Sequence, residues 1–328
     1  MTDASSPPVF RTPIGADDLV TVVGGSGFLG RYIVQELAET GARVRVVCRN
    51  PDAALFLKPL GGLGQILPVA GDVVSGAGLA AAFADATAGI NLVGILAESG
   101  RQTFAATQSE GAARVAQAAA AAGIKRFVQM SAIGADAASP VPYARTKAAG
   151  EAAVLAAIPT ATILRPSLVA GPEDQFFNRF AGMARLAPAL PVIAGDTRFQ
   201  PVFVRDVAAA TMAALDRGDA AGRIYELGGP DVLSFRAIMQ MVVDLTGTGR
   251  PLFDVSNFSA ALLAKAGDIL PFMPMTSDQL AMLKKDNVVG AGMPGLAELG
   301  VSPTPLAAFL PAQLGRYRPG GRFAKQKA

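Results

Sequence analysis

Apolar runs alternate with amphipathic stretches along the first half of the chain. Residues 19–23 are apolar apart from one threonine and predict a buried parallel strand, and residues 31–38 place apolar side chains on one helical face. Further apolar runs predict strands at 44–48, 65–73, 89–94 and 126–131. Strands that alternate with helices in this way predict an α/β fold with a doubly wound parallel sheet.

The pattern continues past the middle of the chain. The predicted helices there are 112–122, 146–158 and 206–215, and the predicted strands are 161–166, 199–207 and 224–230. Asp206 is predicted as the N-cap of its helix, because a carboxylate there can accept hydrogen bonds from free backbone N–H groups. The strand at 224–230 predicts that a late segment returns to the sheet.

These elements predict four parts. Residues 1–18, with three prolines, are expected to form an irregular leader, and residues 19–165 a nucleotide-binding domain. Residues 166–315 are expected to form a smaller mixed C-terminal domain with segments that return to the sheet. Residues 316–328 are glycine- and proline-containing and basic, and are expected to form a tail that is disordered until it meets a partner.

The turn Gly24-Gly25-Ser26-Gly27-Phe28-Leu29-Gly30 joins the first strand to the first helix. Glycines at 24, 27 and 30 allow a tight turn, a close approach to a pyrophosphate and close packing of the helix on the strand. The free N–H groups of the helix N-terminus would face the phosphates. Within a strand-turn-helix-strand unit, this pattern predicts a Rossmann dinucleotide site.

Two residues at strand ends refine the expected nucleotide. Arg49 occupies the position where an acidic residue would bind the ribose of NAD, so its guanidinium favours the 2′-phosphate of NADP(H). A solvated arginine at a strand end is the alternative. Asp72 follows the third strand, where it could accept from the adenine amino group or serve as a turn residue.

Three polar residues suggest chemistry without histidine. Ser131 ends the fifth strand, and Tyr143 and Lys147 are expected one turn apart on one helical face. A nearby ammonium stabilises tyrosinate and would lower the pKa of Tyr143, which would let its phenol act as a general acid or base.

Composition excludes other chemistries. The chain has no histidine and one cysteine, Cys48, which excludes histidine bases, Ser-His-Asp triads and clustered thiolates, so no metal site is expected. The single cysteine suits a reducing compartment, and neither a secretory signal nor a transit peptide is evident. The longest uncharged stretch, 299–315, contains three prolines expected to interrupt a helix, so no transmembrane segment is expected. The net charge of +3 is concentrated in the tail, and no nucleic acid is expected as a partner.

The glycine turn and the Ser131, Tyr143, Lys147 set resemble the extended or atypical short-chain dehydrogenase/reductase family. Further motifs resemble, within it, the NADPH-binding accessory subunit of respiratory complex I (NADH:ubiquinone oxidoreductase), in its bacterial form. These motifs are 91–96, 165–167 with 171–174, 200–202, 225–230, and 277–279 with 286–289.

The resemblance implies roles for individual residues. It implies that the pyrophosphate is held by Gly24, Ser26, Gly27, Phe28, Leu29 and Gly30. It implies that Arg49 binds the 2′-phosphate, that Asp72 and Val73 bind the adenine, and that Tyr143 and Lys147 reach the nicotinamide ribose. Val93, Ser131, Pro166 and Ser167 complete the implied NADPH site. Gln108 departs from the asparagine that the family often has, which weakens the case for an intact proton relay.

The resemblance also implies a function. The expected protein is a structural subunit that binds NADPH without turning it over, contacts other complex I subunits, and lies peripherally on the cytoplasmic side of the bacterial inner membrane. The alternatives are a free NADPH-dependent reductase or epimerase, in which Tyr143 would be catalytic, and a nucleotide-sensing regulator. Apolar residues 258–270 and 271–275 with the basic tail predict docking beside anionic lipid head groups, whereas an ordinary core helix is the other interpretation of 258–270.

Overall fold

The computed structural model describes residues 13–256, 259, 265 and 277–321, apart from the side chains of 278 and 279. These residues form two compact units. The described residues of the first unit are 13–166, 204–227 and 291–302, and the second contains 167–203, 228–290 and 303–321 with the gaps just given. Each unit is therefore assembled from segments that are separated in the sequence.

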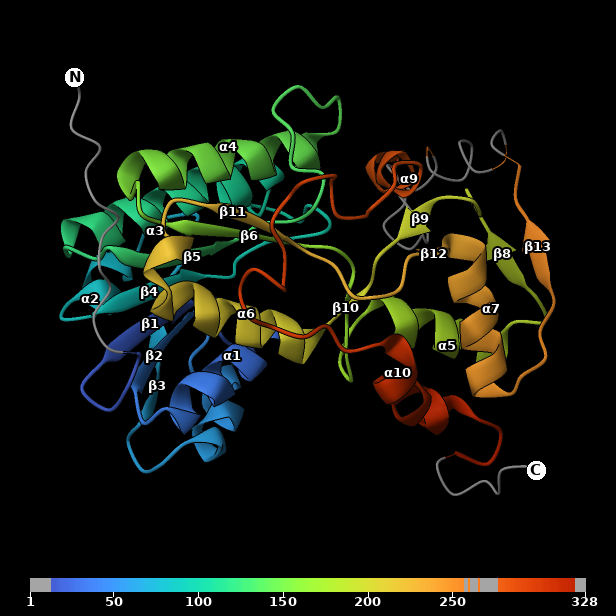
Figure 1. The fold of residues 1–328 in the computed structure, drawn as a ribbon, viewed down its shortest axis with the longest axis horizontal. Helices are drawn as coiled ribbons and strands as arrows, with labels where there is room; N and C mark the ends of the chain where they lie inside the picture. The colour runs from blue at the N-terminus through green and yellow to red at the C-terminus, as the bar shows by residue number, and fades with distance from the viewer. Residues whose placement is uncertain (1–12, 257–258, 260–264, 266–276, 322–328) are drawn as a thin grey trace. The chain divides into compact units, whose positions relative to one another are not determined.

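The first unit is built on a parallel sheet, whose strands can be followed in Figure 1 from one edge of the sheet to the other. Among the described residues it has seven strands in the order β11-β6-β5-β4-β1-β2-β3. Their bounds are β1 Leu19–Val23, β2 Arg43–Cys48, β3 Ile66–Ala70, β4 Ala88–Asn91, β5 Arg126–Met130, β6 Thr162–Pro166 and β11 Ile224–Leu227. All six pairings are parallel, which confirms the predicted fold class and the return of a late strand to the sheet.

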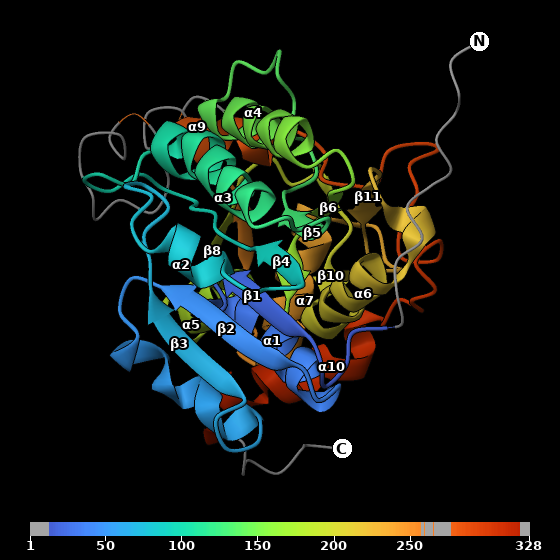
Figure 2. The ribbon, with the colours of Figure 1, turned by 90° about the vertical axis from the view of Figure 1, so that its left-hand side faces the viewer.

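Helices cover both faces of this sheet. Figure 2 shows α3 and α4 on one face and α1 and α6 on the other. The helices of this unit are α1 Phe28–Glu39, α2 Leu79–Phe83, α3 Glu110–Ala121, α4 Pro142–Ala157 and α6 Val204–Asp216, with shorter turns η1 Asp52–Leu60, η2 Ala105–Ser109 and η3 Gly218–Ala220. Strand residues such as Val20, Val22 and Ile90 are fully buried, as expected where both faces are covered.

The second unit packs helices around an aromatic cluster. Its helices are α5 Phe176–Leu186, α7 Phe235–Thr246, α9 Ser277–Leu283 and α10 Leu306–Leu314, with the turn η4 Gly315–Tyr317. Its strands pair two by two: β7 Val169–Ala170 with β10 Val202–Phe203, β9 Arg198–Phe199 with β12 Leu233–Ser234, and β8 Leu190–Val192 with β13 Leu252–Asp254. Phe176 has its ring 5.0 Å from that of Phe180 and 6.1 Å from that of Phe235. Side chains of this size supply much of the apolar area that a small unit needs.

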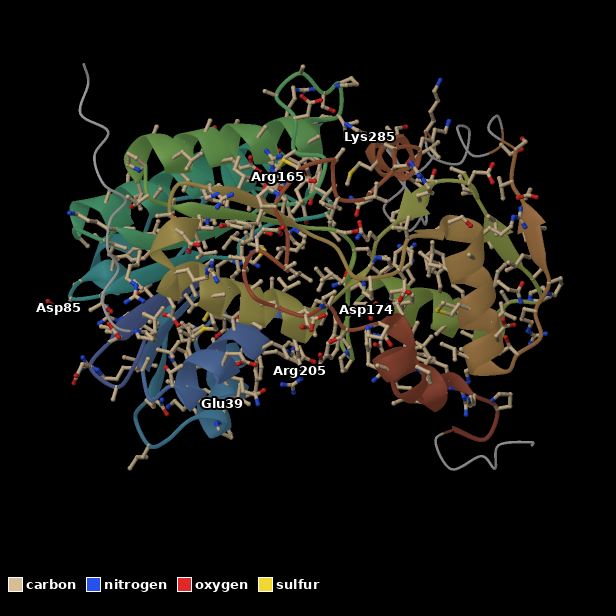
Figure 3. All side chains as sticks on the ribbon, in the orientation of Figure 1. Glu39, Asp85, Arg165, Asp174, Arg205 and Lys285 are labelled. Carbon is tan, nitrogen blue, oxygen red and sulfur yellow. The ribbon has the colours of Figure 1, made fainter. Side chains whose placement is uncertain are left out.

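A buried carboxylate ties α10 to α5 within the second unit. Asp174, labelled beside α10 in Figure 3, is 3% exposed and accepts a 2.5 Å hydrogen bond from the Gln313 amide. It also accepts a 2.6 Å bond from the Phe177 backbone N–H in the first turn of α5. Burial raises the pKa of this carboxyl, and these hydrogen bonds oppose the rise.

Several sequence-based bounds differ from the structure. Asp206 lies inside the first turn of α6, which begins at Val204, so it is not the N-cap. Helix α4 begins at Pro142, before the expected residue 146, because proline is favoured in the first helical turn. In the stretch 299–315, helix α10 forms in spite of Pro311. Its prolines therefore did not prevent a short helix.

The C-terminal expectations have mixed outcomes. Arg316 donates to the Pro172 carbonyl and to Asn178 Oδ1, and Arg318 donates to the Leu245 carbonyl. The expectation that the tail lacks structure from residue 316 onward was therefore wrong for 316–321. Residues 322–328 and nearly all of the expected docking segment 258–275 lie outside the described residues. Among the described helices, none is long and apolar enough to cross a membrane.

Candidate nucleotide-binding site

A pocket of about 270 Å³ opens at the carboxyl ends of β1, β2 and β4 and beside the residues that follow β3. Ligands of open α/β sheets bind at this edge. Of the residues implied by the sequence, the pocket wall contains Gly24, Ser26, Gly27, Arg49, Asp72, Val73 and Val93. Phe28, Leu29 and Gly30 form the first turn of α1. The structure thus gathers the expected pyrophosphate and adenosine residues around one cavity.

The glycine turn has the geometry that the sequence predicts. Gly24 adopts φ +81°, a backbone conformation that residues with a side chain rarely adopt. A Cβ on Gly24 would lie 3.0 Å from Val93 Cγ2. Gly27 is the N-cap of α1. A Cβ on Gly30 would overlap the Gly25 backbone, so a side chain there would push α1 away from the turn. The turn fits a dinucleotide, because side chains at Gly24 and Gly30 would collide with neighbouring protein atoms and a helix N-terminus is suited to bind phosphates.

Arg49 is exposed at the end of β2 and lies against Gln102. With its amide oxygen turned toward the guanidinium, Gln102 accepts a hydrogen bond from Arg49. Gln102 is fixed by an antiparallel bridge to Ser99, in which each backbone N–H donates to the other's carbonyl. The loop after β4 thus reaches the residue that would hold a 2′-phosphate, a contact that the sequence did not predict.

Asp72 and Cys48 have other local roles at the same pocket. Asp72 Oδ1 accepts a 2.8 Å hydrogen bond from the Val74 N–H, which is the turn role considered for it. Among the described residues no side-chain hydrogen bond is made by its second oxygen, which leaves the adenine role considered for Asp72 open. Burial raises the pKa of the Cys48 thiol, so little reactive thiolate forms.

Tyr143 and Lys147 lie one turn apart on α4, and both are buried. The Lys147 Nζ is 6.0 Å from the centre of the Tyr143 ring, and a Cβ on Gly94, in the pocket wall, would lie 3.0 Å from the same Nζ. Burial raises the pKa of Tyr143 to about 12, opposite to the predicted direction. Burial also lowers the pKa of Lys147 to about 8, which Glu151 partly opposes. Burial therefore dominates the pKa of Tyr143, although a lysine with a pKa of about 8 stays mostly protonated at pH 7.

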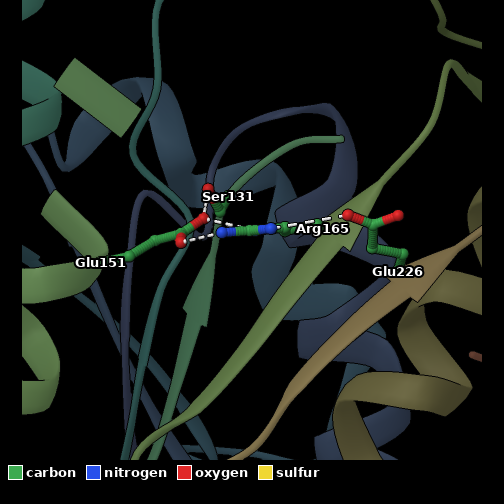
Figure 4. A network of polar contacts seen from close by, with 4 residues as sticks. All are labelled: Ser131, Glu151, Arg165 and Glu226. Carbon is green, nitrogen blue, oxygen red and sulfur yellow. Dashed lines mark hydrogen bonds and ion pairs between the residues drawn. The ribbon is translucent and has the colours of Figure 1, made fainter. Parts of the chain in front are cut away.

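Ser131 takes part in a network of polar contacts with Glu151, Arg165 and Glu226, which Figure 4 shows. Its hydroxyl donates to Glu151 Oε1. Arg165 donates to both oxygens of Glu151, at 2.9 and 2.6 Å, and its Nη1 lies 3.5 Å from Glu226 Oε1. Sequence reasoning missed Glu151, although it stands four residues after Lys147 on the same helix. Pro166 ends β6 next to Arg165.

The turn η2 before α3 has π-helical hydrogen bonding and contains a further pocket residue. Thr107 lines the pocket with 3% of its surface exposed. Gln108 is equally buried, and its amide nitrogen donates a 3.3 Å hydrogen bond to the Ile95 carbonyl. Single π turns occur often at functional sites. An alanine-rich neighbourhood gave no signal for Thr107 in the sequence.

The late motif 286–289 contacts two of the other family motifs inside the second unit, and one of these contacts a third. The Ser167 hydroxyl, which the resemblance implies for the NADPH site, donates a 2.7 Å hydrogen bond to the Asn287 side chain within this unit. Gln200 donates to the Gly229 carbonyl and accepts from the Val289 N–H. Asp286 pairs with Arg198 at 2.7 Å. These contacts explain why the motifs occur together, since they hold one another in place.

The fold and the glycine turn define a protein of the class that binds nicotinamide nucleotides on a Rossmann sheet. The chain belongs to the NAD dependent epimerase/dehydratase family, whose model matches residues 20–228. No cluster of metal-ligating side chains occurs in the described part of the chain.

Curated relatives and solved structures extend this assignment. The chain is 37% identical to a protein of Arabidopsis thaliana named NADH dehydrogenase (ubiquinone) 1 alpha subcomplex subunit 9, mitochondrial, over 92% of this chain and 79% of that protein. A protein named ceramide reductase, from Caulobacter vibrioides, is 34% identical over 60% of this chain and 61% of its own length. The fold resembles an NADPH-dependent quinone oxidoreductase of Escherichia coli complexed with NADPH, with a TM-score of 0.71 and 22% identity, covering 90% of this chain and 99% of that one.

Proposed function

We propose that this protein is an accessory subunit of respiratory complex I that holds NADPH as a stabilising ligand and does not turn it over. The observation that carries the proposal is a nucleotide pocket beside a tyrosine whose pKa burial raises to about 12. A proton-transferring tyrosine works best with a pKa near the operating pH. The relative named as a complex I subunit, matched over nearly the whole chain, supports the same role.

In this proposal each pocket residue has a binding task. Gly24, Gly27 and the N-terminus of α1 hold the pyrophosphate, and Arg49 with Gln102 beside it receives the 2′-phosphate. Tyr143, as a neutral phenol, and Lys147, as an ammonium group at neutral pH, bind the nicotinamide ribose. When bound, NADPH could supply a hydride, but the protein's own groups are arranged to hold the nucleotide rather than to move a proton.

The proposed location is the peripheral arm of the complex beside the membrane, on the cytoplasmic side of a bacterial inner membrane. The cationic tail supports this placement, because each cation near an anionic lipid surface contributes about 1 kcal/mol. Other complex I subunits are the proposed partners, and lipid head groups contribute to attachment.

Co-purification tests the proposal. A tagged full-length protein, isolated from the membranes of its source, is expected to bring down NADH:ubiquinone oxidoreductase activity together with bound NADPH. Tyr143→Phe should leave that electron transfer nearly intact, whereas Gly27→Val, which blocks the cradle, should reduce nucleotide content and assembly. Recovery of the protein free of the complex, with reductase activity that Tyr143→Phe abolishes, would establish the free enzyme instead.

A further inference from the structure

Lys147 and Glu151 stand one helical turn apart on α4, a spacing at which a lysine and a glutamate can pair. Both side chains are buried, with 7% and 5% of their surface exposed. Among the described residues, however, the ion pair of Glu151 on this side is made with Arg165 and not with Lys147. The ammonium of Lys147 instead lies beside Gly94 in the pocket wall, where a Cβ on that glycine would be 3.0 Å from Nζ.

Arg165 occupies both oxygens of Glu151. Its guanidinium donates to them at 2.9 and 2.6 Å, and the Ser131 hydroxyl donates to one of the same oxygens, as Figure 4 shows. On the other side of the guanidinium, Nη1 lies 3.5 Å from Glu226 Oε1, which holds the arginine in place. A planar fork on both oxygens binds a carboxylate more strongly than an ammonium does, so Arg165 outcompetes Lys147 for Glu151.

The other elements that pack on α4 bring no carboxylate to Lys147 among the described residues. The turn Ala105–Ser109, which contacts α4, contains no charged residue, and the two charged side chains of α3 pair with each other at 2.9 Å. Tyr143 on the same helix is neutral at physiological pH, because burial raises its pKa to about 12. Glu151 is therefore the group that would draw Lys147 away from the pocket wall if Arg165 released it.

We propose that Arg165 is a positioning residue for nucleotide binding: by holding Glu151, it leaves the ammonium of Lys147 free to reach the dinucleotide. The inference rests on the proposed function, in which Lys147 binds the nicotinamide ribose. Arg165 acts through Glu151 and Lys147 and needs no contact of its own with the nucleotide. The buried ion pair of Glu151 with Arg165 therefore has a task in binding as well as in the fold.

The test compares Arg165→Met with the double variant Arg165→Met/Glu151→Gln in the full-length protein, and NADPH affinity and melting temperature are measured for each. Arg165→Met should weaken NADPH about tenfold or more, because the released Glu151 pairs with Lys147 and a charge-assisted contact with the ribose is lost. The second substitution should restore most of this affinity, because a neutral amide no longer holds the ammonium. If Arg165→Met does not fold, Arg165→Lys, which keeps the charge but not the fork, carries the same comparison with and without Glu151→Gln.

A pH series separates this role from a general disturbance of the site. The affinity of the unmodified protein for NADPH should fall as pH rises through about 8, where Lys147 loses its proton. In Arg165→Met, pairing with Glu151 raises the pKa of Lys147, so the fall should move to higher pH. The control is Arg126→Met, which breaks a 3.0 Å ion pair with Asp216 on the neighbouring strand β5. It should lower the melting temperature and leave the affinity and its pH dependence unchanged.

Unchanged NADPH affinity in folded Arg165→Met would overturn the inference. A double variant that binds as weakly as Arg165→Met, with the fall in affinity still near pH 8, would also overturn it, because Arg165 would then have a purely structural role. If the unmodified protein does not bind NADPH, the proposed nucleotide function fails and this inference fails with it. That outcome is distinct from the other two, in which the unmodified protein binds the nucleotide.

Discussion

At the residue scale, burial shifts the pKa values of Tyr143 and Lys147, the two groups proposed to bind the nicotinamide ribose. Tyr143 and Lys147 are 9% and 7% exposed, and in both cases desolvation disfavours the charged form. The same two residues could serve acid-base catalysis in a wetter site. Here, Phe104 packs edge-on against the tyrosine ring, with ring centres 5.8 Å apart, which helps to keep water out.

The lowered pKa of Lys147 predicts a pH dependence of stability. Between about pH 8, its folded pKa, and its ordinary value of 10.5, the unfolded chain binds more protons than the folded one. The nucleotide-free protein should therefore gain stability as pH rises through this window, by at most about 1.4 kcal/mol per pH unit from this residue. Denaturant unfolding of the unmodified protein and of Lys147→Met, measured from pH 7 to 10, isolates the contribution as a difference. A difference that stays flat across the window would contradict the burial argument.

Arg49 predicts the nucleotide preference. Each charge-assisted contact with a phosphate contributes roughly 1.5 to 3 kcal/mol, so Arg49→Asp should weaken NADPH about tenfold to a hundredfold and favour NADH. Arg43→Asp, at the opposite end of the same strand, is the matched control and should leave the NADPH to NADH ratio unchanged. Titration calorimetry measures both ratios, and equal binding of the two nucleotides by the unmodified protein would refute the role of Arg49.

The backbone features of the site could be predicted from the sequence better than the pKa values and partners of its side chains. The spacing of Gly24, Gly27 and Gly30 encodes a turn locally, so the cradle could be predicted. The pKa of Tyr143 depends on burial by distant segments, which spacing does not encode. The partner of Ser131 was missed for a similar reason, because Glu151 is 20 residues away and meets it only through the packing of α4 on β5.

At the element scale, close packing of helices depends on which glycines face a neighbour. Gly150 lies in α4 against the π turn, where a Cβ would overlap a carbonyl oxygen, whereas Gly182 lies in α5 with no atom within 4 Å of an added Cβ. Helix α3 packs on α4 at this point. Both glycines lie within helices, but only Gly150 has no room for a side chain.

These two positions give a paired prediction. Gly150→Ala should destabilise the protein by about 1 to 3 kcal/mol through overpacking. Gly182→Ala should stabilise it by about 0.5 to 1 kcal/mol, because alanine has the higher helix propensity. Thermal unfolding of both variants against the unmodified protein checks the signs. Equal effects in the two variants would mean that α4 can move away from the π turn without cost.

Periodicity identified the elements of the first unit and missed most of the second. The strands of the central sheet are apolar runs of four or more residues, which stand out in a sequence. The paired strands of the second unit are two or three residues long, and no periodicity can appear over that length. Helix α7 has a clear apolar face and a serine cap, Ser234, and could have been predicted from them.

At the scale of the whole molecule, the proposed attachment to a membrane complex can be tested with two truncations of the basic C-terminus. Deleting residues 322–328 removes Arg322, Lys325 and Lys327 and leaves the contacts of Arg316 and Arg318 in place. This truncation should keep NADPH bound and release the protein from its complex more readily as salt rises. Deleting 316–328 should in addition lower the melting temperature. Retention of the shorter protein through high-salt washing, equal to that of the full chain, would exclude the tail as an anchor.

The assembly of the first unit from separated segments has a consequence for biosynthesis. A ribosome that has released residues up to 166 has supplied six strands of the sheet but neither the edge strand β11 nor helix α6, which packs on α1. The backbone N–H of Glu226 in β11 in turn donates to the Pro294 carbonyl, which is synthesised later still. Apolar sheet surface therefore stays in water while translation continues, a state prone to aggregation. A premature stop before residue 302 would remove part of the first unit, so quality control acting on that unit would also report whether synthesis had passed residue 302.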